Sequence, residues 1–151
     1  MTSIGLNIVQ LDPSSFTAKC TAALNAGEFV KPDNATIDVV SSTGMKSLAD
    51  GDITIDACDA TADGLLVVGI AAETGAANDY IAVYTEGIFI LEASEAIAVG
   101  NRIQKSINNA SEDNYAGVLD VAAASDIPRK IGIALTTANA AGSWFVAMVR
   151  M

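Results

Sequence analysis

The stretch that decides the fold is DYIAVYTEGIFILEAS, residues 79–94, which is apolar and rich in β-branched and aromatic residues. This composition favours a β-strand, and the Glu86-Gly87 pair near its middle is typical of either a hairpin turn or a bulge. Two later stretches have the same character: IAVGNRIQKS at 97–106 and IGIALTTANAAGSWFVAMVR at 131–150. Each predicts a strand, a turn and a second strand, so the chain is expected to be mainly β.

Several of the expected strands are apolar on both faces. Residues 65–70, 88–91 and 144–149 lack the polar face of a strand in an exposed antiparallel sheet. A small barrel or sandwich covers one face, and a neighbouring subunit is a natural cover for the other. The pattern therefore indicates one small β domain, at residues 16–151, that associates with another chain.

Residues 1–15 are expected to form an extended N-terminal arm. Ile4, Leu6 and Ile8 alternate with their neighbours at a β period, and Asp12-Pro13-Ser14-Ser15 ends the segment as a turn. Such an arm can pair within the domain or add a strand to a neighbour's sheet.

Helix is expected only in short pieces. The segment 16–24 is compatible with a strand or a short helix, one helical turn is expected at 45–49, and a short helix at 118–124. No internal repeat and no linker that would divide the chain is visible.

The charge of the chain limits its partners. The 151 residues carry 8 Lys or Arg against 18 Asp or Glu, a net charge of −10, which makes nucleic-acid binding unfavourable. Residues 33–100 hold twelve of the acids and one base, Lys46. Either this middle segment supplies most of the solvated surface, or the two ends meet a partner while the middle faces away.

The sequence predicts neither a membrane span nor a leader. The longest apolar run is 65–72, far below the roughly 20 residues of a membrane-spanning helix, and residues 1–10 lack the pattern of a secretory signal. We expect a soluble protein made in the cytoplasm.

The residues that catalysis needs are missing. The chain has no histidine, which excludes Ser–His and Cys–His nucleophiles, and Lys46 fits neither an S-x-x-K dyad nor a phosphate-binding loop. We therefore expect no catalytic residue, no cofactor and no enzyme activity. Cys20 and Cys58 are expected to be small buried hydrophobes, although a bridge between them remains an open alternative.

The acidic span 50–63 is the one candidate for a metal site. Asp50, Asp52 and Asp56 supply carboxylates that Ca²⁺ could bind, but the EF-hand spacing is absent, and Asp50 also suits a turn before Gly51. This span supports an alternative function, a Ca²⁺-dependent binding or adhesion module.

Four short motifs in the C-terminal half suggest a family. TEGIF at 85–89, IAVGNRI at 97–103, IGIAL at 131–135 and WFVAMVR at 144–150 occur in the order that resembles the capsid decoration, or cement, proteins of tailed phages. In that family the second motif reads AVGD, so Asn101 replaces an acidic residue. The N-terminal half carries no matching motif.

The resemblance implies a small β-barrel or β-tulip, usually a homotrimer, on the outer surface of a phage head. Such a protein is synthesised in a host cytoplasm, bridges neighbouring major capsid subunits and stabilises the shell. With a phage context, the alternative for the acidic span 50–63 is a Ca²⁺-dependent binding or adhesion module of a virion fibre or tail. The residues expected to contact the capsid or another subunit are Ile4, Leu6, Ile8, Tyr84, Phe89 and Trp144.

Overall fold

The computed structural model describes residues 7–8, 14–33, 39–42, 45–48, 53–58, 66–106, 115–118 and 131–151, and every regular element within them is a β-strand. The prediction of a mainly-β fold is thereby confirmed. The strands are β1 (Asn7–Ile8), β2 (Ser14–Cys20), β3 (Phe29–Pro32), β4 (Val39–Ser42), β5 (Met45–Leu48), β6 (Thr54–Ala57), β7 (Gly69–Ala71), β8 (Tyr80–Ala93), β9 (Arg102–Lys105), β10 (Tyr115–Val118), β11 (Gly132–Ala134) and β12 (Trp144–Arg150).

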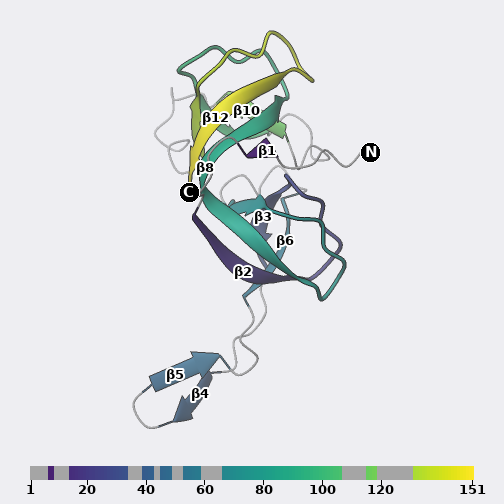
Figure 1. The fold of residues 1–151 in the computed structure, drawn as a ribbon, viewed down its shortest axis with the longest axis vertical. Helices are drawn as coiled ribbons and strands as arrows, with labels where there is room; N and C mark the ends of the chain where they lie inside the picture. The colour runs from purple at the N-terminus through teal and green to yellow at the C-terminus, as the bar shows by residue number, and fades with distance from the viewer. Residues whose placement is uncertain are drawn as a thin grey trace.

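Strand β8 is the centre of the architecture, because two closed rings of strands share it (Figure 1). The first ring runs β8–β2–β6–β3–β7 and returns to β8. The second runs β8–β12–β11–β9–β10 and also returns to β8. In Figure 1 the teal β8 passes from the lower, first ring into the upper, second ring. Strands β4 and β5 form a separate hairpin that lies away from both rings.

The two rings are built from the same pairings in the same order, so the chain contains an internal repeat. In the first ring β2 pairs antiparallel with β8 and parallel with β6, while β3 pairs antiparallel with β6 and β7. In the second, β8 pairs antiparallel with β12 and parallel with β10, while β9 pairs antiparallel with β10 and β11. The final contacts, β7 with β8 and β11 with β12, are antiparallel in both. The expectation of no internal repeat was wrong.

The registers define which residues of the two rings are counterparts. Seven members of the first core have a counterpart that is also buried, and the pairs are Ala18 and Leu91, Cys20 and Ala93, Leu24 and Ile97, Val30 and Ile103, Ala71 and Ala134, Ile81 and Phe145, and Val83 and Ala147. Only one of these pairs is an identity. The two rings therefore share the positions of their buried residues, but they rarely share the residue type at those positions.

The second core extends beyond the second ring. Phe29, Cys58 and Ile70 belong to the first ring, yet they pack in one cluster with Phe89, Phe145 and the other buried side chains of the second. The side chains on the other face of the same first-ring strands, such as Val30 and Ala71, form the first core. The sheet β3–β7–β8 is thus apolar on both faces because each face borders a core.

Several local expectations can now be decided. Met45–Leu48 forms strand β5, so the helical turn expected at 45–49 was wrong. The segment 16–24 is a strand as far as Cys20, and β8 continues unbroken through Gly87, which removes the hairpin alternative. The register between β2 and β8 slips by one residue beside Ser14 and Ser15, as a bulge requires. The helix expected at 118–124 lies, apart from Val118, outside the described residues.

Glycine is required at one position that recurs in both rings. Gly69 and Gly132 begin the tripeptide GIA in β7 and β11. A Cβ on Gly69 would lie 2.7 Å from the carbonyl oxygen of Tyr84. Met148 is the repeat counterpart of Tyr84, and a Cβ on Gly132 would overlap the carbonyl oxygen of Met148. The closing strands therefore approach more closely than a side chain permits.

We expect Gly132→Ala to lower the free energy of unfolding by about 3 kcal/mol, because the clash is with backbone that cannot rotate away. The matched control is Gly100→Ala, since Gly100 has a positive φ of 83° but no atom within 4 Å of an added Cβ. That change should cost about 1 kcal/mol of backbone strain. Denaturant titrations give both values, and equal losses would contradict the close approach.

Candidate functional site

Each ring ends in two loops, which we call the ring-end loops: residues 21–28 and 72–79 in the first ring, and 94–101 and 135–143 in the second. An isolated antiparallel bridge joins the two loops of a ring, between Leu24 and Gly75 in the first and between Ile97 and Ala138 in the second. Both partners of each bridge donate a backbone hydrogen bond, with N···O distances of 2.8–3.0 Å. The loops are therefore held as pairs.

The last residue of three ring-end loops closes its own turn with a side-chain oxygen. This oxygen accepts from the backbone N–H three residues earlier, and the acceptor and donor residues are Glu28 and Asn25 at 2.9 Å, Asp79 and Ala76 at 2.8 Å, and Asn101 and Ala98 at 2.8 Å. An amide oxygen accepts as a carboxylate does. The Asn101 side chain therefore closes its turn as the carboxylates of Glu28 and Asp79 close theirs.

The residue before the closing position has a left-handed backbone in every ring-end loop. These residues are Gly27, Asn78, Gly100 and Gly142, with φ of 91°, 74°, 83° and 79°. Glycine and asparagine are the residues that adopt this conformation most readily. The ring-end loops are thus built from local chemistry that serves the fold.

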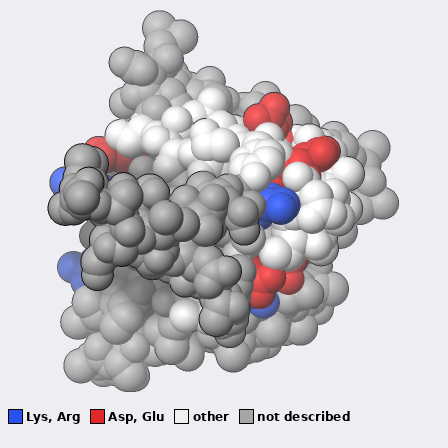
Figure 2. All heavy atoms as spheres, turned by 90° about the horizontal axis from the view of Figure 1, so that it is seen from below, with Lys and Arg blue, Asp and Glu red and all other residues white. Residues whose placement is uncertain are grey.

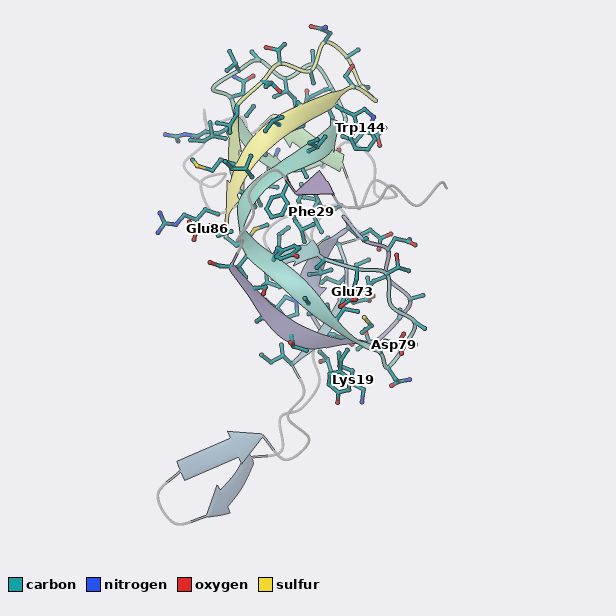
Figure 3. All side chains as sticks on the ribbon, in the orientation of Figure 1. Lys19, Phe29, Glu73, Asp79, Glu86 and Trp144 are labelled. Carbon is teal, nitrogen blue, oxygen red and sulfur yellow. The ribbon has the colours of Figure 1, made fainter. Side chains whose placement is uncertain are left out.

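Exposed aromatic side chains begin the strand that follows one loop of each ring. Tyr80 is 55% exposed and Trp144 is 44% exposed, and the two are repeat counterparts. The cross-strand partner is a base in one ring and an acid in the other. Lys19 pairs with Tyr80, with its Nζ 5.9 Å from the ring centroid, and Glu92 pairs with Trp144. Figure 3 shows Lys19 and Trp144 far apart along the long axis of the molecule.

The residues predicted to contact a partner differ in their exposure to solvent. Trp144 is exposed on β12, whereas Phe89 is fully buried and Tyr84 is half-buried, with their ring centroids 5.8 Å apart. Ile8 belongs to β1, which pairs with Phe89 and Ile90 of β8 in the same chain. Ile4 and Leu6 lie outside the described residues. Among the three members of this set whose side chains are described, Tyr84, Phe89 and Trp144, it is Trp144 that is exposed to solvent.

Of the three residues predicted to bind a metal, the structure describes Asp56. Asp56 is half-buried and its Oδ1 accepts from the N–H of Ala57 at 2.9 Å, while Asp50 and Asp52 lie outside the described residues. Among the residues that are described, no three Cys, Asp or Glu side chains gather in a way that could hold a metal ion.

The cysteines are consistent with the prediction of small buried hydrophobes. Cys20 and Cys58 are both buried and are not bonded to each other. Burial raises the pKa of the Cys20 thiol, and the nearby carboxylates of Asp79 and Glu73 raise it further. The thiol is therefore held in its neutral form, which is a poor nucleophile.

No helix within the described residues could span a membrane. Three polar side chains of the ring-end loops close their own turns, and Tyr80, Trp144 and Met148 are exposed on strands of the rings.

Comparison with known proteins gives a fold and no family. No family model matches the chain, and a search of curated proteins returned no match. Among solved structures, the chain is similar to the N base of the head fiber protein gp8.5 in bacteriophage phi29, with 15% identity and a TM-score of 0.51. The alignment covers 91% of this chain and 94% of that one. At this identity the likeness establishes the fold.

Sequence reasoning missed the internal repeat, although two signals of it are present. The tripeptide GIA occurs in both β7 and β11. The ring-end loops end in the dipeptides GE, ND, GN and GS, each a left-handed residue followed by a polar one. These dipeptides follow an isolated buried residue, Leu24, Gly75, Ile97 or Ala138, by three or four positions.

We expect Asn101→Ala to lower the free energy of unfolding by about 1 kcal/mol, the typical cost of losing a side-chain cap on a backbone N–H. The control is Asn101→Asp, which retains the acceptor oxygen and should change stability by less than half as much. Thermal unfolding of both variants gives the comparison. If the two substitutions cost the same, the cap does not stabilise the loop.

Proposed function

We propose that this protein is a structural component of a phage head, a decoration protein that binds the outer surface and bridges neighbouring major capsid subunits. It acts by contact area rather than by chemistry, and it has no catalytic site. It works as a homotrimer, in which three linked copies occupy adjacent positions with high effective concentration.

The observation that carries the proposal is the extent of the structural similarity. The alignment with a head fiber base spans nearly the whole of both chains, so it includes both rings and not a single common barrel. The shared fold supports a role at a phage head, because the neighbour is a head protein. The four motifs in the C-terminal half point independently toward proteins that bind phage heads.

The surface of the described residues supports a binding role. Trp144 is exposed on a strand, and tryptophan is enriched among the residues that dominate binding energy at interfaces. The net charge of −10 would limit aggregation of decorated particles through mutual repulsion.

A second candidate is favoured by the name of the structural neighbour. That protein is the base of a head fiber, so this chain could serve as the head-bound base of an appendage. Both roles require the same contact with the head surface, and they differ in whether a further protein is attached to the base.

We expect the purified protein to bind empty mature heads of the parent phage and to raise the temperature at which they break. Binding is measured by co-sedimentation and disruption by light scattering during heating. An unrelated protein of similar size and negative charge is the control, because charge alone should give no binding. A protein that leaves the heads unbound and unstabilised is not a decoration protein.

The N-terminal arm is expected to contribute to this binding. Within the described part of the arm, β1 pairs with β8 at Asn7 with Ile90 and Ile8 with Phe89, and both rings close without β1. Deletion of residues 1–11 should therefore abolish head binding and leave the circular dichroism spectrum unchanged. Deletion of residues 1–3, which retains Ile4, Leu6 and Ile8, is the control. Unchanged affinity after the longer deletion would remove the arm from the mechanism.

A further inference from the structure

The repeat shows one strand edge that is paired in the second ring and open in the first. In the second ring, β1 pairs antiparallel with Phe89 and Ile90 of β8. The counterparts of these two residues in the first ring are Phe16 and Thr17 of β2. Within the described residues no strand pairs with β2 on the corresponding edge at these two positions, because the pairing of β6 with β2 begins at Lys19.

The backbone N–H of Thr17 points to this open edge. In a strand, the peptide groups of successive residues point to opposite edges. The N–H of Cys20 donates to the carbonyl oxygen of Asp79 at 2.8 Å, on the side of β8, and the N–H of Lys19 donates to the carbonyl oxygen of Ile53 at 2.7 Å, on the side of β6. Thr17 lies two residues before Lys19, so its N–H and C=O point away from β8.

Burial differs between the two rings at this edge, although one residue type is the same. Phe89 is fully buried where β1 pairs with it, whereas its counterpart Phe16 is half-buried. Ile90 is half-buried, and its counterpart Thr17 is exposed. Phe16 already packs against the first core. A segment added along the edge of β2 would therefore extend the cover of a side chain that is apolar in both rings.

The open edge lacks the side chains that usually protect one. Proteins commonly block a free edge with charged residues or proline, and Ser15, Phe16 and Thr17 are neither. The register shift between Ser14 and Ser15 limits the edge at one end, and β6 limits it at the other. Figure 3 shows Glu86, the cross-strand partner of Ser14, where the two rings meet. The edge therefore accepts a short segment, as β8 accepts β1.

The described strands of this protein do not supply that segment. Strand β1 is already paired with β8, and β4 and β5 are paired with each other, in every copy of the chain. The occupant is therefore a different protein. The chain has a net charge of −10, and Figure 2, which views the molecule from the first-ring end, shows Asp and Glu side chains at several places on that surface. An acidic segment would be repelled, so the segment that fits is uncharged or basic.

We propose that the edge of β2 at Phe16 and Thr17 receives an extended segment of the major capsid protein, which pairs antiparallel with β2 as β1 pairs with β8. Main-chain hydrogen bonds hold the added segment. An apolar residue of the segment lies opposite Phe16, as Ile8 lies opposite Phe89 in the second ring. The inference rests on the proposed function for the identity of the partner and on the repeat for the geometry.

The test compares Thr17→Pro with Thr17→Val in the binding of the full chain to empty mature heads of the parent phage, measured by co-sedimentation. Proline removes the N–H at the open edge and obstructs an added strand, so the dissociation constant should rise at least about 10-fold. Because this N–H points away from β8, proline is compatible with the fold at this edge. Valine keeps the N–H and the branched shape of threonine, and it should leave the dissociation constant within about twofold. Circular dichroism and melting temperature show whether each variant folds.

Hydrogen exchange of the unaltered chain gives a measurement that needs no variant. The amide of Thr17 should exchange rapidly in the isolated protein and at least about 100-fold more slowly on the heads, because pairing protects it. The amide of Cys20 is the control, since it is bonded within the chain and should exchange slowly in both states.

Equal binding by the two variants, or a Thr17 amide that stays unprotected on the heads, would overturn this inference and leave the proposed function standing. Heads that the unaltered protein does not bind would contradict the proposed function and the inference with it. Protection of Thr17 that appears without heads as the protein concentration rises would assign the edge to a second copy, and it would also overturn the inference.

Discussion

The sharing of β8 is the constraint on which the rest of the structure depends. One strand of 14 residues closes the first ring with its first half and opens the second ring with its second half. At Glu86, near the change of ring, the strand pairs with Ser14 on one edge and with Arg150 on the other. Neither ring can lose its pairing with β8 without disturbing the other.

Closure solves two physical problems at the same time. A closed ring of strands leaves a free edge only where one strand extends beyond its partner, so a second chain can pair at few places. A ring of five short strands, however, encloses few side chains and is a poor core by itself. The second core overcomes this by including Phe29, Cys58 and Ile70, which point out of the first ring. The two rings therefore form one folding unit, although each is topologically complete.

This arrangement also changes the meaning of strands that are apolar on both faces. In the sequence they indicate a cover on each side, and a neighbouring subunit is the natural second cover. For the sheet β3–β7–β8 the second cover is the other ring of the same chain. In β12, Phe145, Ala147 and Val149 form one face, which is buried, while Trp144 and Met148 are exposed on the other face. The argument for an external partner therefore holds for β12 and not for β8.

Much of the strand content could be predicted from the sequence, since residues 80–93 and 144–150 have strong β composition, although β8 lacks the turn expected at Glu86-Gly87. The segment 45–48 was not, because Met, Lys and Leu are good helix formers, and pairing with β4 overrides that local preference. The residues expected to contact a partner share an apolar or aromatic character, but the burial of each one depends on the register between distant strands. The sequence could not distinguish buried Phe89 from exposed Trp144.

The repeat itself escaped detection for a physical reason. The side chains at neighbouring core positions change size in opposite directions between the rings. Ile81 of the first ring corresponds to the larger Phe145, and Val83 corresponds to the smaller Ala147. Counterparts lie 73 residues apart from Leu24 to Ile97 but 63 apart from Ile70 to Ile133, because the β4–β5 hairpin interrupts only the first ring. A fixed period is therefore absent from the sequence even though the topology repeats.

A duplicated ring separates what the fold requires from what the surroundings require. Gly69 and Gly132 are the same in both rings, since each permits the same close approach of backbone. Phe29 and Arg102 occupy counterpart positions and differ completely, since one faces a core and the other faces solvent. The polar Arg102 is what a terminal repeat needs on its outer face. Met148, the counterpart of Tyr84, keeps an apolar side chain at such an outer position and is 46% exposed, because the fold places no demand on the residue type there.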